Sequence, residues 1–273
     1  MTTNTVVRQL TLGVCSAVLL VTLFLSYAWA LHEQVQCQTC HVLSAEAKDG
    51  VSKDLRVPRS AICLSCHDAE QDITTLHPPY VINGQKKLAG GSFTATLDSD
   101  DAGHNIVFMD ATLGLTPPGG ESRDEFNCLS CHDPHTNGNY RNLKTEINGR
   151  PTPVNGLGDP DFQKNLYISG INNFCGACHQ TFVDGQAIGS GGAWRRHPVG
   201  ISIYGSRHAD FNHWAGQPDK ITLNEFPSGN PNDQQGAQVF CLSCHVAHAG
   251  PYRNALRWDY GKNTQGCLEC HSF

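Results

Sequence analysis

The sequence predicts a mostly irregular fold with short α-helices and little β-structure. Only 39% of the 273 residues are hydrophobic, and the chain contains 27 glycines and 14 prolines. No long stretch repeats apolar residues at the period of a helix or of a strand. A chain with so many turn-forming residues and so few apolar ones needs another source of buried apolar surface, and the cysteines indicate what it is.

The pattern Cys-x-x-Cys-His occurs six times and uses all but one of the 13 cysteines. Two thiols separated by two residues lie on one side of a turn, where both can form thioethers with the vinyl groups of haem. The adjacent histidine then offers an imidazole nitrogen to the iron. The predicted thioether cysteines are Cys37, Cys40, Cys63, Cys66, Cys128, Cys131, Cys175, Cys178, Cys241, Cys244, Cys267 and Cys270. The predicted proximal ligands are His41, His67, His132, His179, His245 and His271.

Zinc ribbons and disulfides also use paired cysteines. The separations Cys40 to Cys63 and Cys244 to Cys267 are close to those of zinc ribbons. Neither kind of site needs a histidine directly after the second cysteine of every pair, whereas haem attachment does. We therefore expect six haem c groups, whose porphyrins form the core of a multihaem cytochrome c fold.

A second axial ligand for each iron can come from the eight histidines outside the motifs. His135 and His248 occupy equivalent positions after two of the motifs, and three residues are too few to reach the far face of their own haem, so each should serve a neighbouring one. His77 and His197 precede prolines, which stiffen the loop that presents them. The predicted distal ligands are His77, His104, His135, His197, His213 and His248, with His208 and His32 in reserve.

The motifs form three successive pairs, which predict three two-haem modules at about 31–100, 101–205 and 206–273. A repeat relates the second and third modules, because Cys128–His135 is echoed by Cys241–His248. Further on, residues 139–143 resemble residues 251–256 if one residue is deleted. Short helices are expected to lead into these motifs, over 122–131 and 232–244.

Residues 1–30 are typical of an export signal, because Leu10–Leu25 is almost wholly apolar and Ala28-Trp29-Ala30 is a small-x-small cleavage site. The alternative is an uncleaved anchor, since Leu10–Ala30 is long enough to span a bilayer. Either way the chain is exported, to the periplasm or the cell exterior, where thioether haem attachment takes place and the environment is oxidising. The membrane is a partner only if the leader stays in place.

The formal net charge is −6, and the basic residues are scattered rather than clustered. Proteins that bind nucleic acid present a basic patch or stripe. We therefore expect no nucleic-acid partner.

The chain resembles the multihaem c-type cytochromes with doubled CxxCH motifs, which are known in metal-reducing and related anaerobic bacteria. The likeness is carried by the six motifs, the Cys-His-x-x-His sequences and the segments His77-Pro78 and His197-Pro198. It implies electron transfer along closely spaced, bis-histidine haems of low potential. Some of these cytochromes polymerise into extracellular filaments, and others work as periplasmic carriers or in quinone oxidoreductase complexes.

Together these observations predict an electron carrier in extracytoplasmic respiration rather than an enzyme. Its expected partners are other cytochromes or a quinone oxidoreductase complex. One alternative is a subunit of an extracellular cytochrome filament, in which His32 or an iron of the first motif pair would be shared between subunits. Another is a multihaem oxyanion reductase with one open iron, although the CxxCK variant used by some nitrite reductases is absent.

Overall fold

The computed structural model describes about half of the chain. The described residues are 35–43, 51–55, 59–68, 80–82, 90–93, 103–104, 106, 116–121, 126–135, 137–157, 166–183, 199–202, 224–225, 227–228, 230, 233 and 235–262. Its helices are α2 (Cys37–Cys40), α3 (Arg59–His67), α4 (Cys128–Cys131), α5 (Ile171–Gly176) and α6 (Cys241–Cys244). Its strands are β1 (His41–Leu43), β2 (Val51–Leu55), β3 (Glu146–Ile147), β4 (Arg150–Pro151), β5 (Asn155–Leu157), β6 (Leu166–Ser169), β7 (Ile201–Ser202), β8 (Asn224–Glu225) and β9 (Gln238–Val239).

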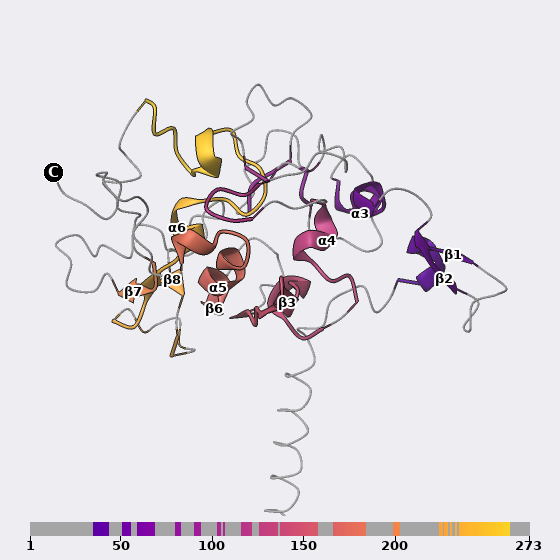
Figure 1. The fold of residues 1–273 in the computed structure, drawn as a ribbon, viewed down its shortest axis with the longest axis horizontal. Coiled ribbons are helices and arrows are strands. Elements are labelled where there is room, and N and C mark those ends of the chain that lie inside the picture. The colour runs from indigo at the N-terminus through magenta and orange to yellow at the C-terminus, as the bar shows by residue number, and fades with distance from the viewer. Residues whose placement is uncertain are drawn as a thin grey trace, which may run out of the picture.

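These elements are short, and irregular chain connects them. The longest described helix, α3, has nine residues, and the longest strand has five. The strands pair antiparallel as β1–β2, β3–β4, β5–β6 and the three-stranded order β7–β9–β8. The ribbon β1–β2 lies at one end of the long axis, and β7 and β8 lie at the other (Figure 1). The predicted fold of short helices, little β-structure and mostly loop is confirmed.

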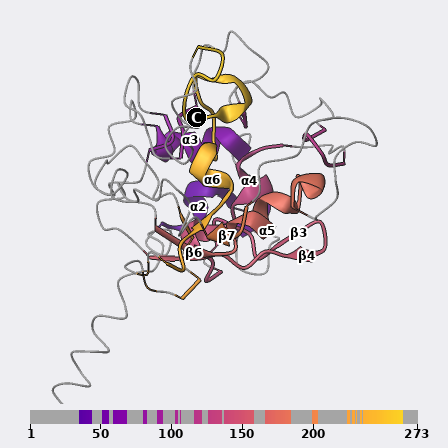
Figure 2. The same ribbon diagram turned by 90° about the vertical axis from the view of Figure 1, so that its left-hand side faces the viewer.

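A small apolar core joins the loop after α4 to α5 and α6. Its buried members are Leu143, Val154, Tyr167, Ile171, Phe240 and Leu242. Helix α5 lies against α6, as Figure 1 and Figure 2 both show. The side-chain oxygen of Asn172 in α5 accepts a hydrogen bond of 3.0 Å from the backbone N–H of Cys241. The core thus places two of the Cys-x-x-Cys-His turns side by side.

The helices at the motifs begin later than expected. Helix α4 begins at Cys128, because Asn127 caps it: the Asn127 side chain accepts from the Leu129 N–H at 2.9 Å. Helix α6 begins at Cys241, and the residues before it form strand β9, which pairs with both β7 and β8. The predicted helix over 232–244 is therefore wrong, since pairing with distant strands overrides the local helical tendency.

The repeat predicted from the second and third modules is present in the backbone. After α4 the Nδ1–H of His132 donates to the Arg141 carbonyl at 3.1 Å, and after α6 that of His245 donates to the Asn254 carbonyl at 2.8 Å. Arg141 and Asn254 both have φ of 58°, which places them in the left-handed region. Each histidine thus bonds to a carbonyl nine residues further on, from the same unusual turn.

This equal spacing corrects one detail of the predicted repeat. The bridges His132 to Leu143 and His245 to Leu256 also span equal lengths of chain, so no residue is deleted in the second copy. The matching letters Tyr-Arg-Asn are offset by one residue from the structural equivalence. The spacing is kept because a turn carbonyl must reach the histidine ring, whereas the side chains of the turn are free to vary.

No helix in the described part of the chain combines the length and the apolar character needed to cross a membrane. The predicted export leader, residues 1–30, lies outside the described residues.

Candidate haem-binding sites

Four of the motifs share one local conformation. A turn carries the two cysteines, and the backbone N–H of the motif histidine donates to the carbonyl of the first cysteine; this bond is 2.9 Å long for His132 and His179 and 3.1 Å for His245. The same bond joins His41 to Cys37. The turn puts both thiols and the imidazole on adjacent positions, which is the arrangement that thioether attachment with axial ligation requires.

Backbone carbonyls orient three of the motif histidines. In each, Nδ1–H donates to a carbonyl from a distant loop, which makes Nε2 the candidate ligand nitrogen. The bonds are His132 to Arg141 at 3.1 Å, His179 to Pro118 at 2.9 Å and His245 to Asn254 at 2.8 Å. His104, outside the motifs, donates in the same way to the Ala247 carbonyl at 2.8 Å. These rings are held with Nε2 directed away from the backbone that anchors them.

Three motif histidines each face a histidine from another part of the chain. The pairs and their ring-centroid separations are His41 with His135 at 6.1 Å, His132 with His248 at 6.3 Å, and His179 with His104 at 5.8 Å. An iron–imidazole bond is about 2 Å and a ring centroid lies about 1 Å behind its nitrogen, so two imidazoles on opposite sides of one iron have centroids about 6 Å apart. The three separations match that value.

The pairs differ in their surroundings. The side chain of His135 is 79% exposed, and its Nδ1 lies 3.6 Å from a carboxylate oxygen of Asp133. Its partner His41 has a buried Nδ1 with no hydrogen-bond partner among the described residues. By contrast, burial lowers the pKa of His248 to about 3 and also lowers the pKa of His104. The buried rings are therefore neutral, which is the form that binds metal.

Attachment points from different motifs also lie together. The Cys63 thiol donates a hydrogen bond to the Cys128 thiol, which lowers the pKa of Cys128 to about 7 and raises that of Cys63. Helices α3 and α4, which carry these cysteines, are in contact. Burial, followed by the nearby Cys66, raises the pKa of Cys40. The first two motifs and the third therefore adjoin one another.

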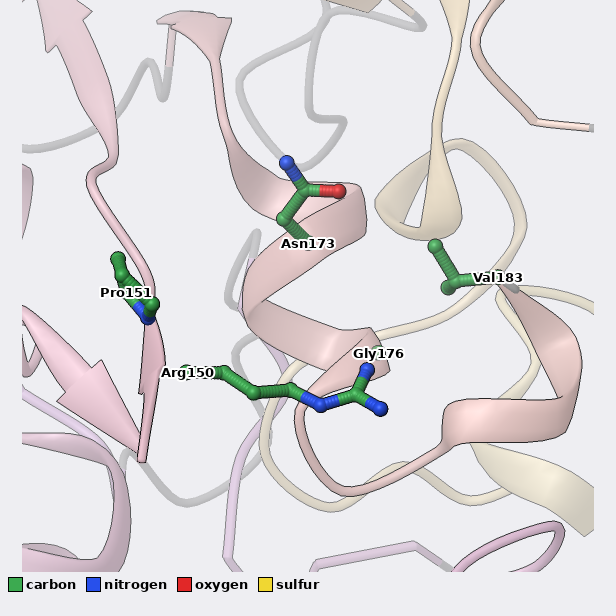
Figure 3. Close-up of a pocket in the computed structure, with 5 residues that line it drawn as sticks. All are labelled: Arg150, Pro151, Asn173, Gly176 and Val183. Carbon is green, nitrogen blue, oxygen red and sulfur yellow. The ribbon is translucent and has the colours of Figure 1, made fainter. Parts of the chain in front are cut away.

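A separate small cavity lies beside α5. Its volume is about 120 Å³, and its lining includes Arg150, Asn173 and Val183. Figure 3 shows the Arg150 side chain reaching across the end of α5 toward Gly176. Small-molecule sites usually enclose about 300–1,000 Å³. This cavity is too small to serve as such a site.

The structure describes ten of the predicted thioether cysteines, five of the predicted proximal histidines and three of the predicted distal ligands. Eight further predicted residues lie outside the described part: Cys267, Cys270, His271, His77, His197, His213, His208 and His32. Sequence reasoning missed the orienting carbonyls of Arg141, Pro118, Asn254 and Ala247, because a backbone group leaves no residue-type signal. It also missed Asp133. The signal that could have found this residue is its position, two residues before a predicted distal histidine.

The described residues fit haem. The donor set is that of haem c, namely paired thiols followed by an imidazole, and in three of the motifs Nδ1 of that imidazole is hydrogen-bonded. Buried donors without an acceptor remain at Arg141 Nε and Trp258 Nε1. A buried polar group without a partner is costly, and a largely apolar cofactor that carries carboxylates would supply acceptors.

Comparison with known proteins agrees with this chemistry. Residues 232–273 match the family described as doubled CXXCH motif. The chain is similar to the C-type cytochrome OmcS of Geobacter sulfurreducens, with 25% identity over 94% of this chain and 66% of that protein. It thus spans slightly less than two thirds of the relative's length. A solved structure, the Outer Membrane Cytochrome S Filament from Geobacter sulfurreducens, has 19% identity and a TM-score of 0.49, over 83% of this chain and 84% of that one.

The repeated thiol–imidazole turns, their facing histidines and the match at residues 232–273 all point to one class of protein. The chain is similar to multihaem c-type cytochromes, and its residues 232–273 match the doubled-CXXCH family.

Proposed function

We propose that the chain is an electron carrier of extracytoplasmic respiration with six covalently attached haem c groups, each iron held between two histidines. The observation that carries this proposal is the set of three facing histidine pairs at 5.8–6.3 Å. When bound, haem supplies one-electron chemistry at iron. Two histidines at an iron leave no position for a substrate, so the proposal is a carrier and not an enzyme.

The chain's own residues provide attachment, axial ligation and orientation. In this proposal His135 is the distal partner of His41, His248 that of His132, and His104 that of His179. His67, His245 and His271 take their partners from His77, His197 and His213, with His208 and His32 in reserve. All twelve motif cysteines form thioethers.

The proposed sites adjoin one another along the chain of motifs. His132 and His135 are three residues apart but belong to two pairs, so one short segment links two irons. Cys63 contacts Cys128, which links the second motif to the third. The backbone N–H of His104 donates to the His248 carbonyl at 3.3 Å, which links the third to the fourth. Asn172 joins the fourth motif to the fifth through Cys241. Such continuity suits transfer between neighbouring sites.

Two measurements on the exported protein test this proposal. Mass spectrometry should find six haems, and electron paramagnetic resonance of the oxidised protein should show low-spin iron throughout. Fewer haems would correct the count. A full equivalent of high-spin iron would overturn bis-histidine ligation at every site and favour the oxyanion reductase.

Self-association into an extracellular filament is the second proposal. It rests on the likeness to doubled-motif cytochromes, some of which polymerise, and on the export that haem attachment requires. The partners would then include further copies of this chain as well as other cytochromes or a quinone oxidoreductase complex. Electron microscopy of secreted material should show filaments, whereas monomers alone at high concentration would refute them.

A further inference from the structure

Arg141 lies beside the His132/His248 pair, where its backbone contacts His132. Its carbonyl accepts the hydrogen bond from His132 Nδ1 at 3.1 Å. The guanidinium carbon is 5.3 Å from the centroid of the Tyr140 ring, which places the side chain over an aromatic face. The backbone of Arg141 thus orients one histidine of the pair, while its side chain extends over Tyr140.

One donor of the half-buried Arg141 guanidinium, Nε, has no acceptor in the described part of the chain. Nε is buried without a hydrogen-bond partner, and no ion pair joins Arg141 to a described acidic residue. Burying a guanidinium N–H without a hydrogen-bond partner is expensive, because arginine stays charged at all physiological pH values. A carboxylate is the acceptor that its planar fork fits best.

The backbone of Arg141 is also held in a costly conformation. Its φ is 58°, and the next residue, Asn142, has φ of 52°. Residues other than glycine, asparagine and aspartate rarely adopt this region. The equivalent residue in the repeated unit is Asn254, which has the same φ and whose carbonyl bonds His245 in the same way. Orienting the histidine therefore does not need an arginine, and the arginine side chain has a purpose of its own.

We propose that the Arg141 guanidinium binds a haem carboxylate at the His132/His248 site and so raises the reduction potential of that site. This inference rests on the proposed function, because the acceptor arrives with the cofactor. A cation that neutralises a propionate disfavours the ferric state, which carries one more positive charge than the ferrous state. Arg141 is thus a positioning residue, and it distinguishes this site from its repeat.

The test replaces Arg141 by asparagine, the residue type found at the equivalent position of the repeated unit. Arg141→Asn removes the guanidinium but retains a side chain that tolerates the left-handed backbone, as Asn254 does. Arg141→Lys keeps the charge without the planar fork. Arg253→Asn is the matched control, because it removes the same charge from an exposed side chain of the equivalent turn. Redox titration of the full-length exported protein, followed by electron paramagnetic resonance, resolves the individual midpoints, and His248→Met marks the site concerned by changing its ligands.

In Arg141→Asn we expect one midpoint, the one that His248→Met alters, to move downward while the others stay in place. Arg141→Lys should show a smaller downward shift, and Arg253→Asn none. Wild-type midpoints in Arg141→Asn, or an equal shift of that midpoint in Arg253→Asn, would overturn the inference. Loss of one haem in both Arg141 variants would also overturn it, because the backbone conformation of residue 141, and not the guanidinium, would then be what the site requires. The proposed function fails separately, if wild-type protein lacks low-spin haem.

Discussion

The imidazole rings of His41 and His135 lie 6.1 Å apart, centroid to centroid, with their planes only 12° from parallel. The two residues come from the first and third motif regions, so the pair joins segments about a hundred residues apart. Of the three pairs it has the smallest interplanar angle, against 33° for His104/His179 and 45° for His132/His248. The predicted first and second modules therefore contact each other through this pair, and the module boundaries stay a prediction.

Removing His135 should open one iron. In His135→Ala we expect the six thioether-bound haems to remain, because no cysteine is lost, while one low-spin signal disappears and one equivalent of high-spin iron appears. Electron paramagnetic resonance and mass spectrometry measure the two quantities on one sample. Tyr260→Ala, at a residue 60% exposed, is the control and should leave the spectrum unchanged. A fully low-spin His135→Ala spectrum would show that another residue is the ligand.

Asp133 should lower the reduction potential of the proposed His41/His135 site. Its carboxylate lies 3.6 Å from Nδ1 of His135, where it increases the electron donation of the imidazole and so favours ferric iron. Asp133→Asn should raise one midpoint, measured by redox titration, while Asp259→Asn, which breaks an ion pair with Lys262, should raise none. The prediction fails if both variants shift the midpoints alike.

Gly170 and Gly138 both have a left-handed backbone, and substitution by alanine should destabilise the protein more at Gly170. It precedes α5 with φ of 100°, and a side chain there would collide with the Pro153 carbonyl. Gly138 has φ of 82° with open space around it. Denaturant titration should show a loss of about 1 kcal/mol in unfolding free energy for Gly138→Ala and about 3 kcal/mol for Gly170→Ala. Equal losses would mean that the collision is relieved at no cost.

Tyr167 should make the fold sensitive to alkali. Burial raises its pKa from the usual 10.0 to about 12. Above pH 10 the unfolded chain loses this proton while the folded chain keeps it, so stability is complete below pH 10 and falls as the pH rises toward 12. Thermal melts of wild type and Tyr167→Phe should diverge over this range, with the variant losing less stability. Parallel curves would show that Tyr167 ionises equally easily in both states.

Much of the chemistry could be predicted from residue types alone. A thioether site needs two cysteines separated by two residues and a histidine directly after the second cysteine. The segment Cys128-Leu129-Ser130-Cys131-His132 can therefore be recognised from the sequence alone. The repeated position of His135 and His248 likewise predicts that each serves another motif, and in the structure the ring of each lies about 6 Å from a histidine of a different motif. The first residue of α6 was harder to predict from the sequence, because the preceding strand β9 forms only by pairing with strands that are distant in the chain.

The sequence by itself determined the kind of cofactor, the attachment residues and the mostly irregular fold, because covalent spacing and composition are local properties. Only the tertiary structure decided which histidines face each other, which carbonyls orient them and where Arg141 lies. Those relationships depend on loops such as residues 116–121 and 137–143 folding back onto distant motifs, and on backbone groups that every residue possesses. His41 and His135 are 94 positions apart in the sequence, and no local pattern in the chain relates them.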